Sequence, residues 1–405
     1  MNKRGKLTII VGANYGSEGK GGFCAHIAHD YDMAIRVGAI QAGHTIYYNE
    51  ETFKMQSIPC AWINPKCKLV IGAGGMIRQD IFEREVRWIA NAMYGGDDNG
   101  IINRMAIDNA CGIMSHEHAD REQARKIDTT IGSTCEGVGE ATADRVRRML
   151  PIASEDDGVI GGLTADTVKI INDALKNGEH VMLEGTQGAA LCLYTGRDKN
   201  GKPFYPNCTS REVTPAGMMA DCGISPGITK YADIEIIAVM RTYPIRIAGP
   251  SGDMGVELTW EEITRRSGSL VPLTEKTTVT KKTRRVGELD KEWTKYVLDY
   301  IQPDKIVLTF ADYINAEDFG KRELSEISDK TKEYVADLEK EIGFPIEWIS
   351  TGPLNDDFVC MKEIPDVELS ALIEMETTLS GLTRPKKHVN PEFAPVYVSK
   401  TSQPS

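Results

Sequence analysis

The chain has 405 residues, enough to bury a large core, and its 41% apolar and 26% charged residues are typical of a folded protein. Its 47 basic and 59 acidic residues give a net charge of -12, which argues against a general nucleic-acid or anionic-membrane surface. No stretch approaches the roughly 18 apolar residues of a membrane helix, and nine spread cysteines without a CxxC pair indicate reduced thiols. We therefore expect a cytoplasmic protein without nucleic-acid or membrane partners, in which any phosphate binding is local.

Four short apolar runs along the chain each end in a polar, turn-like segment. They are Leu7–Val11, His180–Leu183, Lys305–Leu308 and Pro345–Ile349. Continuous apolar runs are typical of strands covered by helices on both faces, so we predict an α/β fold with a mostly parallel central sheet. In such a sheet ligands bind beyond the carboxyl ends of the strands, where the four following loops would meet. Helical patterns at Thr164–Leu175 and Lys330–Ile342 fit the crossover connections.

The sequence shows no internal repeat and no low-complexity linker, so we predict one domain over residues 1–405. Residues from about 100 to 165 are expected to form a smaller lobe outside the main sheet. Residues 386–405 are rich in Pro, Ser and Thr and are expected to form an irregular surface tail.

A glycine-rich segment follows the first predicted strand and reads Gly12-Ala13-Asn14-Tyr15-Gly16-Ser17-Glu18-Gly19-Lys20-Gly21. Glycines let backbone N–H groups approach phosphate oxygens, and a helix starting near Gly19 would direct its positive end at them. Lys20 adds a cation. The segment is not a Walker A sequence, because Asn14 stands at its first glycine and Gly21 replaces its Ser or Thr. Taken alone, it predicts either a P-loop-like phosphate site or a turn without a ligand.

A second polar loop, Gln41-Ala42-Gly43-His44-Thr45, closes the apolar segment Met33–Val37. A histidine flanked by Gly and Thr can donate to a phosphoryl or carbonyl oxygen. A lone histidine is more often a hydrogen-bonded structural residue. His44 is therefore a candidate acid with a structural alternative.

Together the two loops resemble the paired signature of the adenylosuccinate synthetases, Gly-Asp-Glu-Gly-Lys-Gly and Asn-Ala-Gly-His-Thr. Further stretches resemble segments of that family in the same order along most of the chain. They are Ile131–Thr134, Asp144–Arg148, Glu184–Gly188, Tyr205–Thr209, Thr277–Asp290 and Ile349–Pro353. The resemblance implies a ligase that joins aspartate to a purine monophosphate through a 6-phosphoryl intermediate, with hydrolysis of a nucleoside triphosphate and with Mg²⁺.

The resemblance also implies roles for single residues. The triphosphate would contact Gly16, Ser17, Glu18, Gly19, Lys20, Gly21, Gly43, His44, Thr45, Phe310, Asp312, Ser350 and Gly352. The purine monophosphate would contact Ser17, Gln41, Ser133, Thr134, Arg148, Gln187 and Thr209, with Arg148 donated by the partner subunit of a homodimer. Aspartate would contact Thr280, Lys282 and Arg284, and Mg²⁺ would contact Ser17 and Gly43. The catalytic candidates are Ser17, Lys20, Gln187 and His44, the last as the acid that stabilises phosphoryl transfer.

Three positions depart from the family pattern. Ser17 replaces the aspartate that serves as general base on the purine N1 and touches Mg²⁺, and loss of such a base costs on the order of 100- to 10,000-fold. Phe310 replaces the lysine of the base-reading segment, here Thr309–Asp312, which removes a contact that selects guanine. Lys281 and Lys282 stand where the family has Gly-Arg, and lysine lacks the bidentate fork for a carboxylate.

A serine at the first of these positions marks the bacteriophage and related enzymes that resemble these synthetases. Those enzymes act on dGMP, make N6-succino-2-amino-2'-deoxyadenylate for diaminopurine DNA, and favour ATP or dATP over GTP. We therefore predict dGMP, L-aspartate and ATP or dATP as substrates, and the host cytoplasm as the location if a phage encodes the chain. Two alternatives stay open: an ordinary synthetase acting on IMP with GTP, and a nucleotide-binding regulator without turnover.

Overall fold

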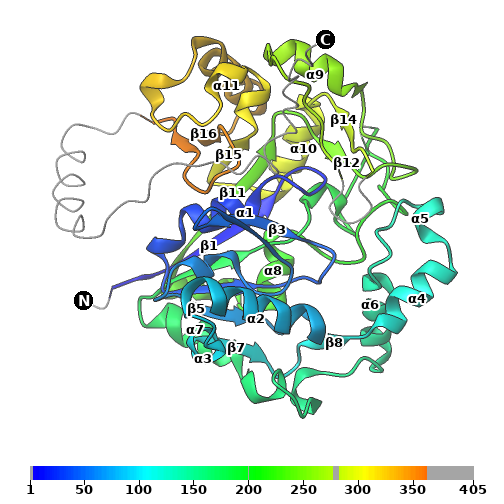
Figure 1. Cartoon of the computed structure of the whole chain (residues 1–405), viewed down its shortest axis with the longest axis vertical. Helices are drawn as coiled ribbons and strands as arrows, with labels where there is room; N and C mark the ends of the chain where they lie inside the picture. Colours follow the sequence, from blue (N-terminus) through cyan, green and yellow to red (C-terminus); the bar gives the residue numbers. More distant parts are fainter. Residues whose placement is uncertain (1–2, 199, 277–281, 363–405) are drawn as a thin grey trace, which may run out of the picture.

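A large, mostly parallel sheet forms the centre of the molecule (Figure 1). The computed structural model describes residues 3–198, 200–276 and 282–362. The strands of the sheet are β1 (Gly5–Gly12), β2 (Met33–Arg36), β5 (Lys68–Ile71), β7 (Met105–Asp108), β9 (Thr164–Ala165), β10 (His180–Glu184), β11 (Ala232–Arg241), β15 (Lys305–Thr309), β16 (Ile346–Ser350) and β17 (Phe358–Cys360). Within the described residues their order is β17-β16-β15-β11-β1-β10-β2-β5-β7-β9, and every neighbouring pair is parallel except β16 and β17. The predicted α/β class is confirmed.

Helices cover both faces of this sheet, which explains why its central strands are apolar without alternation. The helices are α1 (Lys20–His26), α2 (Gln79–Met93), α3 (Asp98–Ile102), α4 (His116–Ala124), α5 (Ile127–Thr130), α6 (Val138–Arg147), α7 (Thr167–Lys176), α8 (Pro215–Asp221), α9 (Trp260–Ser267), α10 (Lys291–Ile301) and α11 (Asp329–Ile342). Leu7 and Ile9 of β1 pack in a buried core with α7, α8, α10 and α11, whereas Ile10 packs in a second core with α1, α2 and α3.

The predicted strands and one predicted helix match the structure closely. The four apolar runs correspond to β1, β10, β15 and β16, and Lys330–Ile342 corresponds to α11. The prediction of a helix over Thr164–Leu175 was wrong at its start. Thr164 and Ala165 pair with β7 as strand β9, and α7 begins only after Asp166, whose side chain accepts a hydrogen bond from the Lys169 backbone N at 2.9 Å.

Smaller elements project from the main sheet. A hairpin of β3 (His44–Tyr48) and β4 (Glu51–Met55) follows the second polar loop, β6 (Met76–Arg78) pairs with β8 (Gly112–Met114), and β12 (Ile245–Arg246), β14 (Arg285–Gly287) and β13 (Glu257–Leu258) form a third small sheet. Helices α4, α5 and α6 gather at one side of the molecule (Figure 1), while β7 and β9 of the predicted 100–165 lobe belong to the central sheet. The division of the chain into domains stays a prediction, and residues 386–405 lie outside the described residues.

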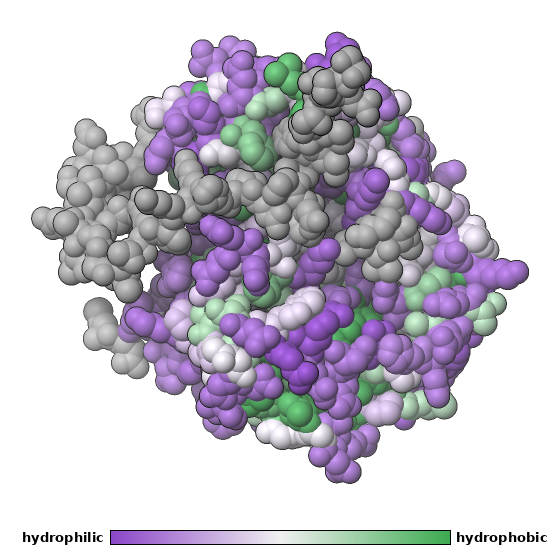
Figure 2. Space-filling model, viewed as in Figure 1, coloured by the Kyte–Doolittle hydropathy of each residue, from purple (hydrophilic) through white to green (hydrophobic). Residues whose placement is uncertain are grey.

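The face shown in Figure 2 is mainly hydrophilic, and its hydrophobic side chains occur in small separate patches. The described residues contain no helix that is both long enough and apolar enough to cross a bilayer.

Candidate active site

The loops singled out in the sequence leave the same edge of the central sheet. β1 lies between β10 and β11, β15 lies between β11 and β16, and these strands are parallel. The Thr309 hydroxyl at the end of β15 donates to the Glu18 carbonyl oxygen at 2.8 Å, and Lys20 Nζ donates to the Gln187 carbonyl oxygen at 2.6 Å. Three of the four loops are therefore linked directly by hydrogen bonds.

The glycine-rich loop is folded around the carboxylate of Glu18. The backbone N–H groups of Asn14 and Gly16 donate to Glu18 Oε1 at 3.2 and 2.7 Å, and Lys20 Nζ lies 2.6 Å from Glu18 Oε2. Both side chains of this ion pair are buried. Lys20 therefore already has two oxygen partners, and a phosphate ligand would have to share it with Glu18.

The next part of the loop presents free backbone N–H groups. Gly16, Ser17 and Gly19 have φ values of 88°, 60° and 86°, and α1 starts at Lys20. In the described part of the chain, no acceptor takes a hydrogen bond from the backbone N–H groups of Ser17, Gly19 or Lys20. Successive N–H groups in such a turn form an anion-binding concavity. The arrangement suits the predicted phosphate site, with Ser17 exposed at its rim.

Gly21 allows α1 to pass directly against His44. A Cβ built on Gly21 would lie 2.6 Å from His44 Cβ and 3.2 Å from Cys60 Sγ, well inside ordinary contact. This explains why glycine stands where a Walker A sequence has Ser or Thr, since either side chain would displace His44.

His44 belongs to a buried network that joins two strands of the sheet. Its Nδ1 lies 2.5 Å from Glu184 Oε1, and Arg36 Nη1 donates to the same oxygen at 2.7 Å. The Cys60 backbone N–H donates to the other oxygen of Glu184 at 2.6 Å. Burial alone would raise the pKa of the Glu184 carboxyl, but the Arg36 guanidinium and the hydrogen bonds from His44 and Cys60 outweigh it and lower that pKa to about 2. Burial together with Arg36 lowers the pKa of His44 to about 4. Glu184 thus fixes the ring of a neutral His44 through Nδ1–H, which leaves Nε2 for a ligand.

Two groups of residues in this region are candidates for holding a metal ion. Donor atoms of His44, Cys60 and Glu184 lie within 4.8 Å of one another, but the Arg36 guanidinium already binds Glu184 and opposes a second cation there. Ser17 and Gly43, the predicted Mg²⁺ ligands, are exposed, and a Cβ on Gly43 would meet nothing within 4 Å. Neutral hydroxyl and carbonyl oxygens suit Mg²⁺ when substrate phosphates supply further ligands. The residues present therefore fit an ion that binds together with a triphosphate.

The predicted base-reading segment, Thr309–Asp312, lies at the end of β15. Phe310 has a φ of 62°, and one face of its ring is covered by the Arg241 guanidinium, whose Cζ lies 3.6 Å from the ring centroid. Burial raises the pKa of the Asp312 carboxyl to about 8. Ser350 is the last residue of β16, the strand that pairs with β15, and its hydroxyl donates to the carbonyl oxygen of Gly352 at 3.3 Å.

Two of the predicted monophosphate segments meet in the structure. Asn207 Nδ2 donates to the Ile131 carbonyl oxygen at 3.1 Å, which joins the segment that carries Thr209 to the segment that carries Ser133 and Thr134. Gln41 has a buried side-chain oxygen without a hydrogen-bond partner among the described residues. Gln187, with a φ of 62°, lies beside the glycine-rich loop through its carbonyl oxygen.

The predicted aspartate segment is described only in part. Thr280 and Lys281 lie outside the described residues. Lys282 is exposed, and Arg284 is half-buried with a pKa lowered by burial. The Arg284 backbone N–H donates to the Glu275 carbonyl oxygen at 2.9 Å, which links Arg284 to the residues just before the segment.

Comparison with known proteins supports the resemblance seen in the sequence. The sequence profile of the family described as Adenylosuccinate synthetase matches residues 9–156 and 157–319. The chain belongs to the adenylosuccinate synthetase family. It is 33% identical over 349 residues to the adenylosuccinate synthetase of Pyrococcus horikoshii, covering 85% of this chain and 95% of that protein. The enzyme of Methanococcus aeolicus is 32% identical over 350 residues, covering 85% and 96%.

Solved structures of two synthetases share the fold. The fully ligated adenylosuccinate synthetase of Plasmodium falciparum aligns with a TM-score of 0.74 and 21% identity, covering 88% of this chain and 100% of that one. The succinoaminodeoxyadenylate synthetase of cyanophage S-2L, bound to dGMP and dATP, aligns with a TM-score of 0.71 and 23% identity, covering 92% and 99%. The predicted C–N ligase is confirmed at the level of the family, which uses Mg²⁺ and a nucleoside triphosphate.

Sequence reasoning missed three charged residues of this synthetase that end buried strands. Arg36 ends β2, Glu184 ends β10, and Arg241 ends β11. Glu184 falls in one of the stretches that resemble the family, whereas Arg36 and Arg241 fall in none of them. A charged residue at the carboxyl end of an apolar run is the sequence signal that could have identified them, because ligands bind at the carboxyl ends of parallel strands.

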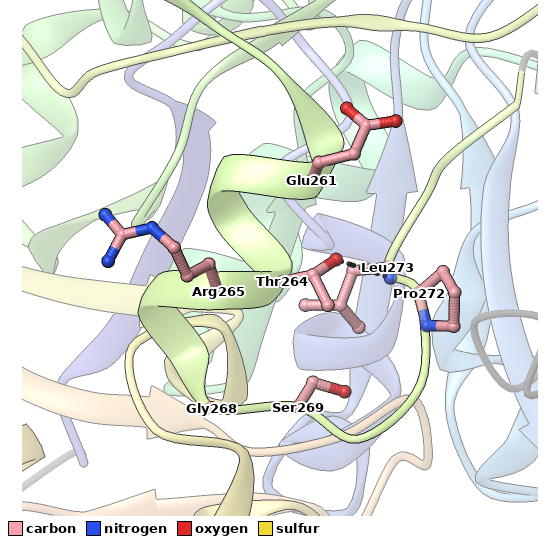
Figure 3. Close-up of a pocket in the computed structure, with 7 residues that line it drawn as sticks. All are labelled: Glu261, Thr264, Arg265, Gly268, Ser269, Pro272 and Leu273. Carbon is pink, nitrogen blue, oxygen red and sulfur yellow. Dashed lines mark hydrogen bonds between the residues drawn. The ribbon is translucent and has the colours of Figure 1, made fainter.

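A separate pocket of about 400 Å³ opens beside α9 (Figure 3) and contains none of the predicted substrate residues. Thr264 on α9 and Leu273 lie next to each other in its lining, and the Thr264 hydroxyl accepts a hydrogen bond from the Leu273 backbone N at 2.9 Å. Arg265 at its edge is paired with Glu262 at 2.7 Å. We assign no ligand to this pocket.

Proposed function

We propose that this synthetase joins L-aspartate to C6 of dGMP through a 6-phosphoryl intermediate, with hydrolysis of ATP or dATP, to give N6-succino-2-amino-2'-deoxyadenylate. The observation that carries the proposal is the exposed hydroxyl of Ser17, a residue that the sequence resemblance assigns to the position of the family's catalytic aspartate. A hydroxymethyl group is smaller than a carboxylate and leaves room for an amino group at C2, next to N1. A neighbour in structure, the cyanophage S-2L enzyme, is bound to dGMP and dATP.

The adjacent carboxylate cannot take over the missing base. Glu18 is fully buried, and its two oxygens bind loop N–H groups and Lys20. Moving it toward a substrate would break the interactions that hold the glycine-rich loop. We therefore propose that a water held by the exposed Ser17 hydroxyl takes the proton from N1 and passes it on to bulk solvent.

The triphosphate preference rests on Asp312 and Phe310. A carboxyl group with a pKa of about 8 is largely protonated at neutral pH and can donate one hydrogen bond and accept another. Adenine offers an acceptor at N1 and a donor at its 6-amino group, whereas guanine offers donors at N1 and the 2-amino group. A protonated Asp312 therefore matches adenine, and the Phe310 ring contributes stacking without selecting a base.

His44 is proposed as the acid of phosphoryl transfer. Its ring is neutral with a pKa of about 4 in the isolated chain, but the negative charge of a bound triphosphate favours the protonated form. Glu184 on Nδ1 would stabilise that imidazolium and direct Nε2–H at the transferred group. Bound Mg²⁺ would supply positive charge at the phosphates, held by the Ser17 hydroxyl and the Gly43 carbonyl oxygen.

We also propose a homodimer in which Arg148 serves the partner's monophosphate site. Arg148 ends α6 with a φ of 62° and is exposed. Val146 and Met149, beside it in the sequence, are each 69% exposed. Apolar side chains around a projecting arginine are typical of a surface that another protein chain covers. The cytoplasm, of the host if a phage encodes the chain, is the proposed location.

One experiment separates the proposal from its alternatives. Phosphate release is measured with aspartate and dGMP, GMP or IMP, each with ATP and with GTP, in the parent and in Ser17→Asp. We expect dGMP with ATP to be the best pair in the parent, and Ser17→Asp to lower dGMP turnover. An improvement of dGMP turnover by Ser17→Asp would overturn the volume argument. The relatives named adenylosuccinate synthetase favour the alternative of IMP with GTP. The absence of any phosphate release that depends on aspartate and a purine monophosphate would favour a regulator.

A further inference from the structure

Arg241 is a fully buried cation at the end of β11, with 1% of its surface exposed. Its Nη1 donates to the Ser17 carbonyl oxygen at 2.9 Å, its Nε donates to the Tyr243 carbonyl oxygen at 3.0 Å, and its Nη2 binds the Glu275 carboxylate. Its backbone N–H donates to Asn14 Oδ1 at 2.8 Å. One side chain and its own peptide therefore bind both sides of the glycine-rich loop.

The same guanidinium stacks on the base-reading segment. Arg241 Cζ lies 3.6 Å from the centroid of the Phe310 ring, within the range of a cation–π contact. The Thr242 hydroxyl, next along the chain, donates to the Phe310 carbonyl oxygen at 2.8 Å. These two contacts hold a residue whose φ of 62° is uncommon for an aromatic side chain.

The third partner of Arg241 leads into the predicted aspartate segment. The Glu275 carboxylate binds Arg241 and lies 3.3 Å from the Tyr313 hydroxyl, while its carbonyl oxygen accepts from the Arg284 backbone N. Lys276 and Thr283 are joined by a β-bridge just beyond. The base of the segment that carries Lys282 and Arg284 is thus anchored to Arg241.

We propose that Arg241 is a positioning residue that fixes the loop of Ser17, the ring of Phe310 and the base of the aspartate segment relative to one another. Arginine suits this position because its planar group donates in three directions and stacks at the same time, which lysine cannot do. The effect that we expect from Arg241 on substrate binding rests on the proposed roles of Ser17, Phe310 and Arg284. Substitution of Arg241 should therefore weaken the binding of both the triphosphate and aspartate, although Arg241 itself is buried beneath the two segments that contact them.

The first test compares Arg241→Lys and Arg241→Met with Arg104→Met. Arg104 is a partly buried arginine that donates to the Asn64 and Trp62 carbonyl oxygens at the amino ends of the strands, away from the site. We expect both Arg241 variants to raise the KM values of triphosphate and aspartate by about tenfold or more. Arg104→Met should lower the Tm and leave both KM values within about twofold.

The second test separates the two contacts of Arg241. Glu275→Gln should raise the KM of aspartate and leave that of the triphosphate within about twofold. In a Phe310→Leu background, Arg241→Lys should have a smaller effect on the triphosphate KM than in the parent, because the stacked ring is already gone. Its effect on the aspartate KM should persist.

Two results would overturn the proposal. One is an Arg241→Lys enzyme with a lowered Tm but parental KM values for both substrates, which is the behaviour of a purely structural arginine. The other is a Glu275→Gln enzyme with a parental aspartate KM, together with additive effects of Arg241→Lys and Phe310→Leu. All variants are assayed with whichever purine monophosphate the parent turns over. A parent that prefers IMP would therefore refute the dGMP proposal and leave this test valid.

Discussion

Gly21→Ala places a single methyl group where α1 passes His44. The new Cβ would lie 2.6 Å from His44 Cβ and 3.2 Å from both His44 Cα and Cys60 Sγ, about 1 Å inside an ordinary contact. These three atoms belong to His44 and Cys60, which are both buried and cannot move freely. The methyl group would therefore displace His44 and disturb its 2.5 Å hydrogen bond to Glu184. Overpacking of this kind costs roughly 1–3 kcal/mol of stability. A displacement of roughly 1 Å at a catalytic group costs about 100-fold in rate.

Gly22→Ala is the matched control for this substitution. Gly22 follows in the same helix, and its new Cβ would approach only the Phe358 ring, at 3.9 Å. We expect kcat of Gly21→Ala to fall by about 100-fold and its free energy of unfolding in urea to fall. Gly22→Ala should keep kcat and gain about 0.5–1 kcal/mol, the helical advantage of alanine. If Gly21→Ala keeps kcat within about threefold of the parent, the close approach of α1 to His44 is not required for turnover.

Three further predictions concern the proposed chemistry. His44→Asn should abolish phosphoryl transfer and leave monophosphate binding by calorimetry largely intact; turnover within a fewfold of the parent would make His44 structural. Arg148→Leu and His44→Asn chains should each be inactive alone and regain activity when mixed, since one site of the hybrid is intact; no recovery despite proven subunit exchange would count against donation in trans. Asp312 loses its proton as the pH rises through about 8, and an ionised carboxylate no longer donates to adenine N1. The ratio of kcat/KM for ATP over GTP should therefore fall between about pH 7 and 9. A constant ratio would exclude Asp312 as the group that reads the base.

Four strands of the central sheet could be predicted because each consists of one continuous apolar run. β1, β10, β15 and β16 are buried on both faces, so local composition alone indicated them. β11 was missed because Asp233 and Glu235 interrupt its apolar residues near the amino end. β9 was missed because two residues form a strand only through pairing with Ile107 and Asp108, which lie far back in the sequence.

In the candidate site too, features formed by residues close together in the sequence could be predicted, whereas contacts between distant residues could not. The glycine-rich loop and His44 were found from residues close together in the chain. The partner of His44 is Glu184, and no local pattern relates positions 140 residues apart. Phe310 was expected to offer its ring to a purine, but the structure covers one face of that ring with Arg241, a contact that depends on the neighbouring strands β11 and β15.

The most direct test of the central claim is the ratio of kcat/KM for dGMP over IMP in the parent enzyme, with aspartate saturating and ATP as the phosphoryl donor. The exposed Ser17 hydroxyl, in a loop whose own carboxylate Glu18 is buried and engaged, predicts a purine with an amino group at C2. The ratio should exceed about 10, which corresponds to about 1.4 kcal/mol of transition-state discrimination. A ratio below 1 would contradict the account and identify the chain as a synthetase that uses IMP with an altered base.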